Sequence, residues 1–201
     1  MKIIFTIAIF FIAHITYSQN SIEWSPDVEI EFSDFQSAST EINESFSKYA
    51  IRSGTLVDFA YAMSNAEFMF TKNFNTKVTT IFNKKASYIT APNEEIANQL
   101  VKFAQLEFDL AELSARKLRK KLYESKGVFS SADFFKPLYD QIMEEHSDRY
   151  SALGKSTDMG RNAEVLVAER EKIKQEIEAL SDYCKTCKPA KKRKRRKGQL
   201  R

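Results

Sequence analysis

One stretch in the middle of the chain constrains the fold more than any other. Residues 100–122 read LVKFAQLEFDLAELSARKLRKKL, with apolar side chains at the spacing that places them on one face of a helix. Pro92 precedes the pattern, and two glutamates then suit a first turn, where the helix dipole favours anions. The sequence therefore predicts one long amphipathic helix from residue 94 to about residue 124. Its expected apolar stripe consists of Ile96, Leu100, Phe103, Leu110 and Leu118.

The region before this helix alternates in polarity as β-strands do. In residues 27–35 (DVEIEFSDF), apolar and polar side chains take turns, which predicts a half-buried strand. Residues 54–63 alternate again, and residues 77–89 are rich in β-branched and aromatic side chains. A turn is expected at residues 73–75. We predict three or four antiparallel strands between residues 27 and 90.

Two further helices are expected after the long one. Gly127 interrupts the helical pattern, and residues 130–150 then form a second helix with Ser130 or Ser131 as its cap. Residues 154–162 (GKSTDMGRN) are expected to form a loop, and residues 164–180 a third helix with a narrow apolar seam. Strands followed by helices indicate an α+β fold.

The first 18 residues predict export. Lys2 gives a positive start, residues 3–13 are apolar but too short to span a bilayer, and small residues occupy positions 16 and 18. We interpret residues 1–18 as a cleaved signal peptide, and no later segment is apolar enough for a membrane span. The mature chain is then expected in the periplasm or outside the cell, as one domain over residues 19–183 followed by a tail over residues 184–201.

The tail concentrates positive charge. Ten of the 31 Lys and Arg residues lie between residues 185 and 201, where no acid occurs, so the rest of the chain is acidic. A dense block within the tail consists of Lys191, Lys192, Arg193, Lys194, Arg195, Arg196 and Lys197. In an exported protein such a block attracts anionic surfaces, for example phosphorylated lipids, rather than nucleic acid. The alternative is a solvated, disordered segment with no specific partner.

Cys184 and Cys187 precede this block. An oxidising compartment favours a disulfide between them or between two chains. A redox motif would need a helix after the cysteines to lower the thiol pKa, and the sequence predicts none there.

Zinc proteases commonly carry His-Glu-x-x-His on a helix, where both imidazoles reach one metal ion and the glutamate acts as a base. Several parts of this chain match a wider pattern around such a helix. The matching residues are Trp24, residues 33–35 (SDF), Ser87 and Tyr88, then Gln105, Phe108, Asp109, Glu112 and residues 115–119 (ARKLR), and finally Thr157 and Gly160. Together they resemble a bacterial secreted zinc-dependent protease family of unknown function, of the domain of unknown function 922 type. The resemblance implies a zincin-like domain.

The motif itself is degenerate in this chain. The first histidine position is Phe103, the base is Ala104, the second histidine is Glu107, and the expected third ligand, a later histidine, is Met159. Zinc sites use three or four protein ligands, and only Glu107 could serve. After signal cleavage, His146 is the single histidine left. We therefore predict no catalytic residue, no bound metal and no cofactor.

The replacements suggest a plugged site. If the family geometry holds, Phe103 and Met159 fill the space that the metal would occupy. Glu107 is expected to be a partly exposed carboxylate that pairs with a Lys or Arg. Glu112 and Arg116 are spaced as a modest surface ion pair. The alternative is that they anchor this helix to its neighbours, and for both residues and Asp109 a scaffolding role is favoured over chemistry. The basic run 116–121 is expected to be a solvated face.

Three functions follow from the sequence. The first is an exported, catalytically inactive metalloprotease-like protein that binds an unknown protein or envelope component, or serves as an envelope scaffold. The second is a secreted hydrolase or metalloenzyme with unrecognised ligands. The third is an adaptor whose tail contacts an anionic surface.

Overall fold

The computed structural model describes residues 20–127 and 130–189. The expected signal peptide and the basic block at residues 191–197 lie outside these residues. Among the helices described, none has the length and apolar character needed to cross a bilayer.

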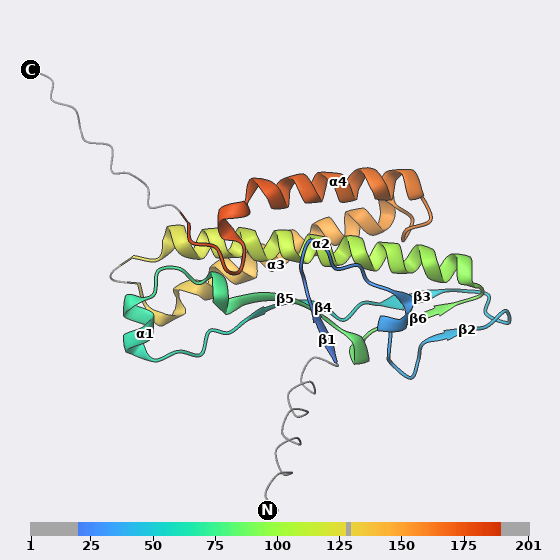
Figure 1. The fold of residues 1–201 in the computed structure, drawn as a ribbon, viewed down its shortest axis with the longest axis horizontal. Coiled ribbons are helices and arrows are strands. Elements are labelled where there is room, and N and C mark those ends of the chain that lie inside the picture. Colours follow the sequence, from blue (N-terminus) through green and yellow to red (C-terminus); the bar gives the residue numbers. More distant parts are fainter. Residues whose placement is uncertain (1–19, 128–129, 190–201) are drawn as a thin grey trace, which may run out of the picture.

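Strands come first and long helices follow, so the predicted α+β class is confirmed (Figure 1). Within the described residues the strands are β1 Ser21–Glu23, β2 Glu41–Ile42, β3 Ala50–Arg52, β4 Thr55–Phe59, β5 Val78–Asn83 and β6 Tyr88–Ala91. The α-helices there are α1 Asn65–Phe70, α2 Glu94–Ser125, α3 Phe135–Ser156 and α4 Ala163–Ala179.

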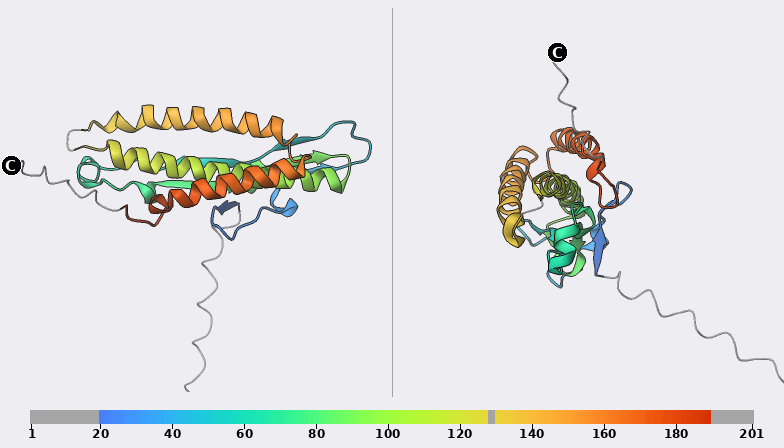
Figure 2. Two further views of the ribbon diagram at one scale, coloured as in Figure 1. Left: turned by 90° about the horizontal axis from the view of Figure 1, so that it is seen from above. Right: turned by 90° about the vertical axis from the view of Figure 1, so that its left-hand side faces the viewer.

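Helix α2 is the axis of the molecule. Its start is fixed by Asn93, whose side chain accepts a hydrogen bond from the amide of Ile96 over 2.9 Å. Its bounds agree with the prediction. Figure 2 shows α3 and α4 along two sides of α2 and the strands along another, and α2 contacts α3, α4 and the strands β4, β5 and β6. The residues of the predicted stripe are buried except Ile96, which is partly buried. Burial extends well beyond one stripe, because α2 is covered on nearly every side between Phe103 and Leu118.

Helix α4 begins and ends within one residue of the predicted range. Helix α3 departs from its prediction at both ends. It begins at Phe135 rather than at residue 130, because Ser131 precedes a short 3-10 helix at Ala132–Phe134 instead of capping α3 itself. It continues to Ser156, so the first residues of the predicted loop at 154–162 are helical. The turn between α3 and α4 is correspondingly tight.

The strands form two small sheets, with orders β1-β5-β4 and β2-β6-β3. Their pairs are antiparallel except β2 with β6, which is parallel, so the prediction of antiparallel strands alone is wrong for that pair. The predicted strand at residues 77–89 is divided, because a short 3-10 turn at Lys84–Ala86 sends β5 and β6 into different sheets. Helix α2 packs across both sheets.

The predicted strand at residues 27–35 is not a strand. Its alternation of burial is present, with Ile30 buried, but no neighbouring strand pairs with it. The amide of Ile30 instead donates to Oε1 of Gln105 over 2.7 Å, and the Gln105 amide nitrogen donates to the carbonyl of Val28 over 3.5 Å. A side chain of α2 thus supplies the hydrogen bonds that a strand would otherwise provide. β1, at residues 21–23, takes the place beside β5.

Candidate functional site

Two of the four positions of the degenerate motif, Phe103 and Met159, lie in an apolar cluster between α2, α3 and α4. Phe103 is buried, with its ring centre 5.7 Å from that of Tyr150 on α3. A Cβ atom placed on Gly154 of α3 would lie 3.3 Å from the sulfur of Met159 and 3.7 Å from Cζ of Phe103. The phenyl ring and the thioether therefore meet over the same point of α3, in the cluster that includes Leu153.

A tight turn after α3 holds Met159 against this cluster. Asp158 and Met159 have φ of 51° and 54°, and Gly160 follows at 96°. A side chain on Gly160 would collide with the carbonyl oxygen of Gln99, so glycine is required there. The hydroxyl of Thr157 donates over 2.7 Å to a carbonyl in the last turn of α3. Thr157 and Gly160, which match the family pattern, both shape this turn.

Ala104 does not face the cluster of Phe103. It is fully buried toward the strands, in the cluster that contains Phe82 and Ile89. Consecutive helix residues point about 100° apart, which accounts for the separation. The structure thus brings Phe103 and Met159 together and directs Ala104 elsewhere.

Glu107 lies one turn after Phe103, and its Oε2 atom is buried without a hydrogen-bond partner. The ion pairs of the described residues do not include it, so the predicted pairing with a Lys or Arg is wrong. Burial raises the pKa of Glu107 to about 8, and a hydrogen bond with the Ser53 side chain opposes the rise. Burial and the proximity of Glu107 raise the pKa of Tyr150 to about 12. At pH 7 the Glu107 carboxyl group is therefore mostly protonated.

Farther along α2, Glu112 is buried with full compensation of its charge. Its Oε1 accepts hydrogen bonds from Arg116 over 3.0 Å and from Arg119 over 2.8 Å, and Thr80 donates to Oε2 over 2.9 Å. Arg116 also donates to a carbonyl of α4, and Arg119 to a carbonyl of β5. The predicted ion pair of Glu112 with Arg116 is therefore present, but it is buried and anchors α2 to its neighbours. Arg119 is buried as well, so the predicted surface location and solvated basic face are wrong. The acceptors come from distant parts of the chain, which local spacing does not reveal.

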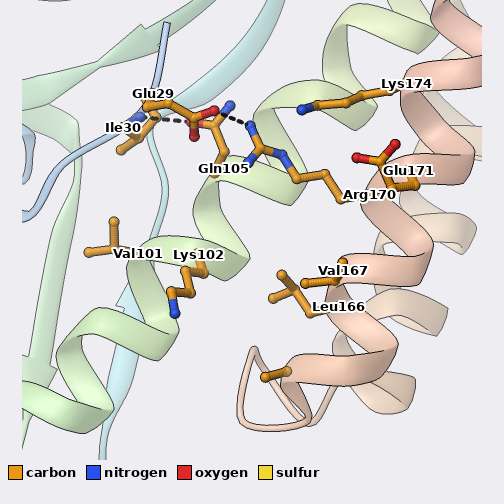
Figure 3. A pocket seen from close by; sticks show the side chains of 11 residues that line it. Glu29, Ile30, Val101, Lys102, Gln105, Leu166, Val167, Arg170, Glu171 and Lys174 are labelled. Carbon is orange, nitrogen blue, oxygen red and sulfur yellow. Dashed lines mark hydrogen bonds and ion pairs between the residues drawn. The ribbon is translucent and has the colours of Figure 1, made fainter.

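A second buried carboxylate joins three segments. Asp109 accepts a hydrogen bond from the indole of Trp24 over 2.9 Å and pairs with Arg170 of α4 over 2.8 Å. Arg170 also pairs with Glu29 over 2.7 Å (Figure 3). Asp109 therefore links α2 to α4 and to the N-terminal segment. In this structure it positions elements of the fold.

Arg170 lines a surface hollow of about 340 Å³ between α2 and α4. Ile30, Val101 and Leu166 supply apolar surface, and Lys102 and Lys174 approach from different helices (Figure 3). No histidine, cysteine or hydroxyl side chain lines it. The hollow offers apolar and charged contacts.

A larger groove of about 510 Å³ lies between β4 and α3, with Ala111 of α2 among its lining residues. His146 contributes to its wall, with Nδ1 3.1 Å from the hydroxyl oxygen of Ser114. Burial lowers the pKa of His146, so the imidazole is uncharged at neutral pH. Tyr139 donates from its hydroxyl to the carbonyl of Val57 over 3.5 Å.

Within residues 20–127 and 130–189, no three His, Cys, Asp or Glu side chains come together as a metal-binding group. No family model matches the chain, and no curated protein or solved structure is significantly similar to it. The family resemblance stays a sequence-based prediction.

Cys184 and Cys187 form a local disulfide, one of the two arrangements expected. The carbonyl of Cys187 accepts hydrogen bonds from the side chains of Asn73 and Asn75, both over 3.0 Å. These contacts hold the disulfide segment on the domain, so the ordered contacts continue past the boundary expected after residue 183.

Sequence reasoning missed two residues beside the motif, Tyr150 and Ser53. A signal for Tyr150 was present, because it lies four residues after His146 and eight after Ile142, so the three side chains share one face of α3. No pattern marks Ser53, which reaches Glu107 only through the folding of the β3–β4 connection.

Proposed function

We propose that this protein is exported and acts by binding, on a protease-like domain that has lost its catalytic centre. The observation that carries the proposal is the packing of Phe103 and Met159 against the same point of α3, at Gly154. Apolar atoms there take up the volume in which a zinc ion and its water would have to fit.

The chemistry of the remaining groups supports the same proposal. A phenyl ring and a methyl group offer no metal ligand, and a thioether is a poor partner for zinc beside oxygen donors. Glu107, with a pKa of about 8, is mostly uncharged at pH 7 and is a weak ligand in that form. Its neighbour Tyr150, with a pKa of about 12, does not supply a phenolate.

The groove between β4 and α3 is the surface best suited to a binding role. The carbonyl of Gly54 accepts a hydrogen bond from the amide of Asn83 in β5, so the backbone groups of the alternating residues Thr55, Val57 and Phe59 point away from β5. Three of these groups are already bonded: the amide of Thr55 to Ser53, the carbonyl of Val57 to Tyr139 and the carbonyl of Phe59 to the amide of Tyr61. A partner in this groove would therefore be held mainly by side-chain contacts rather than by pairing with β4 as an added strand. Apolar side chains of α3 line the other wall.

Elemental analysis of the mature chain, residues 19–201, purified without chelators, tests the loss of the metal centre. We expect zinc below about a tenth of an equivalent, well under the occupancy of a structural or catalytic site. A casein-hydrolysis assay on the same sample is expected to give no activity above buffer. Close to one equivalent of zinc, or hydrolysis that a chelator abolishes, would refute the proposal in favour of a metalloenzyme with unrecognised ligands.

Three variants would then identify those ligands. Each variant removes one candidate ligand or pair of ligands: H146A, E107Q and the double variant C184S/C187S. The replacement that releases the metal identifies the residue that bound it. If all three variants bind as much zinc as the wild type, the zinc is bound elsewhere and the motif positions do not hold it.

A further inference from the structure

The groove between β4 and α3 has an acidic side chain on its wall and no basic one. Among the described residues that line it, Asp58 is the only acid, and neither Lys nor Arg is present. Asp58 is exposed and takes part in none of the ion pairs of the described residues. An anionic ligand would meet only repulsion in this groove, whereas a cation would find a carboxylate without a partner.

Aromatic rings surround this carboxylate. The rings of Tyr61 and Phe135 stack with their centres 5.2 Å apart, and Phe59 meets Phe135 edge-on at the same distance. Tyr61 is nevertheless 62% exposed, so much of its ring is open to a ligand. Burial raises the pKa of Tyr139, and the proximity of Asp58 adds to the rise, which places the carboxylate near that phenol. This end of the groove therefore combines open ring surface with negative charge.

Farther along the groove, His146 offers a hydrogen-bond acceptor. The hydroxyl of Ser114 donates its proton to the carbonyl of Leu110 over 3.0 Å. Nδ1 of His146 must therefore donate to the Ser114 oxygen, 3.1 Å away, and the neutral imidazole keeps a lone pair on Nε2. Within the described residues Nε2 has no hydrogen-bond partner, and it is not among the buried atoms that lack one. A ligand in the groove can reach it.

The two features are separated along α3. Tyr139, near Asp58, and His146 are seven residues apart on this helix, which corresponds to about 10 Å. An extended polypeptide advances about 3.3 Å per residue, so about three residues span the distance. At the aromatic end, a guanidinium group can stack on a ring and donate to a carboxylate at the same time. At the other end, a backbone N–H can donate to the imidazole.

We propose that this groove binds an extended polypeptide segment of a partner protein through an arginine side chain. The guanidinium group lies against Asp58 and Tyr61, and a backbone N–H about three residues away donates to Nε2 of His146. An uncharged segment would leave the carboxylate without a partner, and a small organic cation would reach only one of the two features. The inference rests on the proposed binding role of the groove and adds the chemistry of the partner.

An NMR titration of the ¹⁵N-labelled mature chain tests the inference, with an acetylated and amidated peptide of seven residues, alanine except for a central arginine. We expect amide shifts confined to the groove. D58N should weaken binding about tenfold and Y61L about fivefold, because they remove a charged hydrogen bond and a cation–π contact. D148N is the matched control: Asp148 is exposed on α3 but does not line the groove, so binding should stay unchanged.

Unchanged affinity in D58N, or no shift of the groove amides with the wild type, would overturn the inference. Asp58 and Tyr61 are both exposed, so we expect the thermal unfolding of the two groove variants to match that of the wild type.

Three matched peptides separate charge from shape. Citrulline in place of arginine keeps the shape without the charge and should bind about tenfold more weakly. Lysine should also bind more weakly, because an ammonium group does not stack on a ring, and leucine should bind least. Equal binding of any of these peptides and the arginine peptide would overturn the assignment of arginine and leave the binding role of the groove in place. The zinc and hydrolysis measurements test the loss of the catalytic centre separately.

The imidazole of His146 gives an independent signal, since it is the single histidine of the mature chain. The ¹⁵N resonance of Nε2 should be that of an unprotonated nitrogen and should move upfield when the peptide N–H donates to it. A proton on Nε2 in the free protein, or no movement at saturation, would overturn the assigned acceptor. Shifts of the groove amides that depend on protein concentration without peptide would place a second copy of the chain in the groove instead.

Discussion

Glu107 and Glu112 lie five residues apart on one buried helix and meet opposite surroundings. Two arginines and a threonine donate hydrogen bonds to Glu112. The Oε2 atom of Glu107 is buried without any donor, beside the apolar contact of Phe103 with Met159. The same residue type is therefore part of an ionic cluster in one half of α2 and of an apolar region in the other.

The comparison teaches that burial alone does not decide what a carboxyl group does. Removing water penalises the charged form at both positions, and nearby cations and hydrogen-bond donors offset that penalty. Arg116 and Arg119 supply those cations to Glu112, whereas Glu107 takes up a proton at pH 7 instead. A region without compensating cations is poorly suited to bind a metal through a carboxylate, and well suited to hold two elements together.

The largest effect is expected from E112A. The substitution leaves two buried guanidinium groups without their counter-charge, and breaking a buried pair in this way costs about 4 kcal/mol of unfolding free energy. Urea unfolding followed by circular dichroism measures this loss at pH 7. A loss below about 1 kcal/mol would show that the backbone carbonyls of α4 and β5 suffice for the arginines, and the contrast with Glu107 would disappear.

The second prediction concerns E107Q and depends on pH. The folded pKa of about 8 lies above the ordinary value of 4.5, so Glu107 contributes stability that is complete below pH 4.5 and is lost as the pH rises toward 8. The glutamine side chain of the variant is neutral at every pH in this range. We therefore expect E107Q to match the wild type near pH 4.5 and to exceed its unfolding free energy by about 3 kcal/mol at pH 7.

Unfolding of both proteins at several pH values between 4.5 and 8.5 checks this difference. E171Q is the control, because Glu171 is an exposed glutamate whose replacement should give a flat difference across the range. A flat difference for E107Q as well would mean that the carboxyl group stays charged, and would bring Glu107 back as a candidate ligand.

The sequence predicted those parts of the fold that local patterns determine. Helix α2 was placed correctly because its cap at Asn93, its acidic first turn and its apolar spacing are all local. The strand predicted at residues 27–35 was misassigned for the opposite reason. Its alternation is real, but the hydrogen-bond partner of Val28 and Ile30 is Gln105, more than 70 residues away. The parallel pairing of β2 with β6 is another contact that no local pattern encodes.

The candidate site divides in the same way. The resemblance pointed to Phe103 and Met159, and the structure places them in contact with the same residue of α3. The surroundings of Glu107 could not be predicted, because Ser53 and Tyr150 reach it from other elements. The basic run after Glu112 was expected to be solvated, because the carbonyls that accept hydrogen bonds from Arg116 and Arg119 lie on α4 and β5, far away in the sequence.

The smallest effect is expected from E67A, which removes the same chemical group from an exposed pair. Glu67 and Lys77 are 2.7 Å apart, as close as the buried pairs, but their side chains are 42% and 29% exposed. Water stabilises both charges when the pair is broken, so we expect a loss of only about 0.5 kcal/mol. Urea unfolding of E67A, K77A and the double variant gives the coupling energy directly. A coupling energy above about 2 kcal/mol would mean that this ion pair, rather than the packing of Phe68, stabilises α1. The losses of stability for Glu112, Glu107 and Glu67 would then follow the distance to a partner rather than burial.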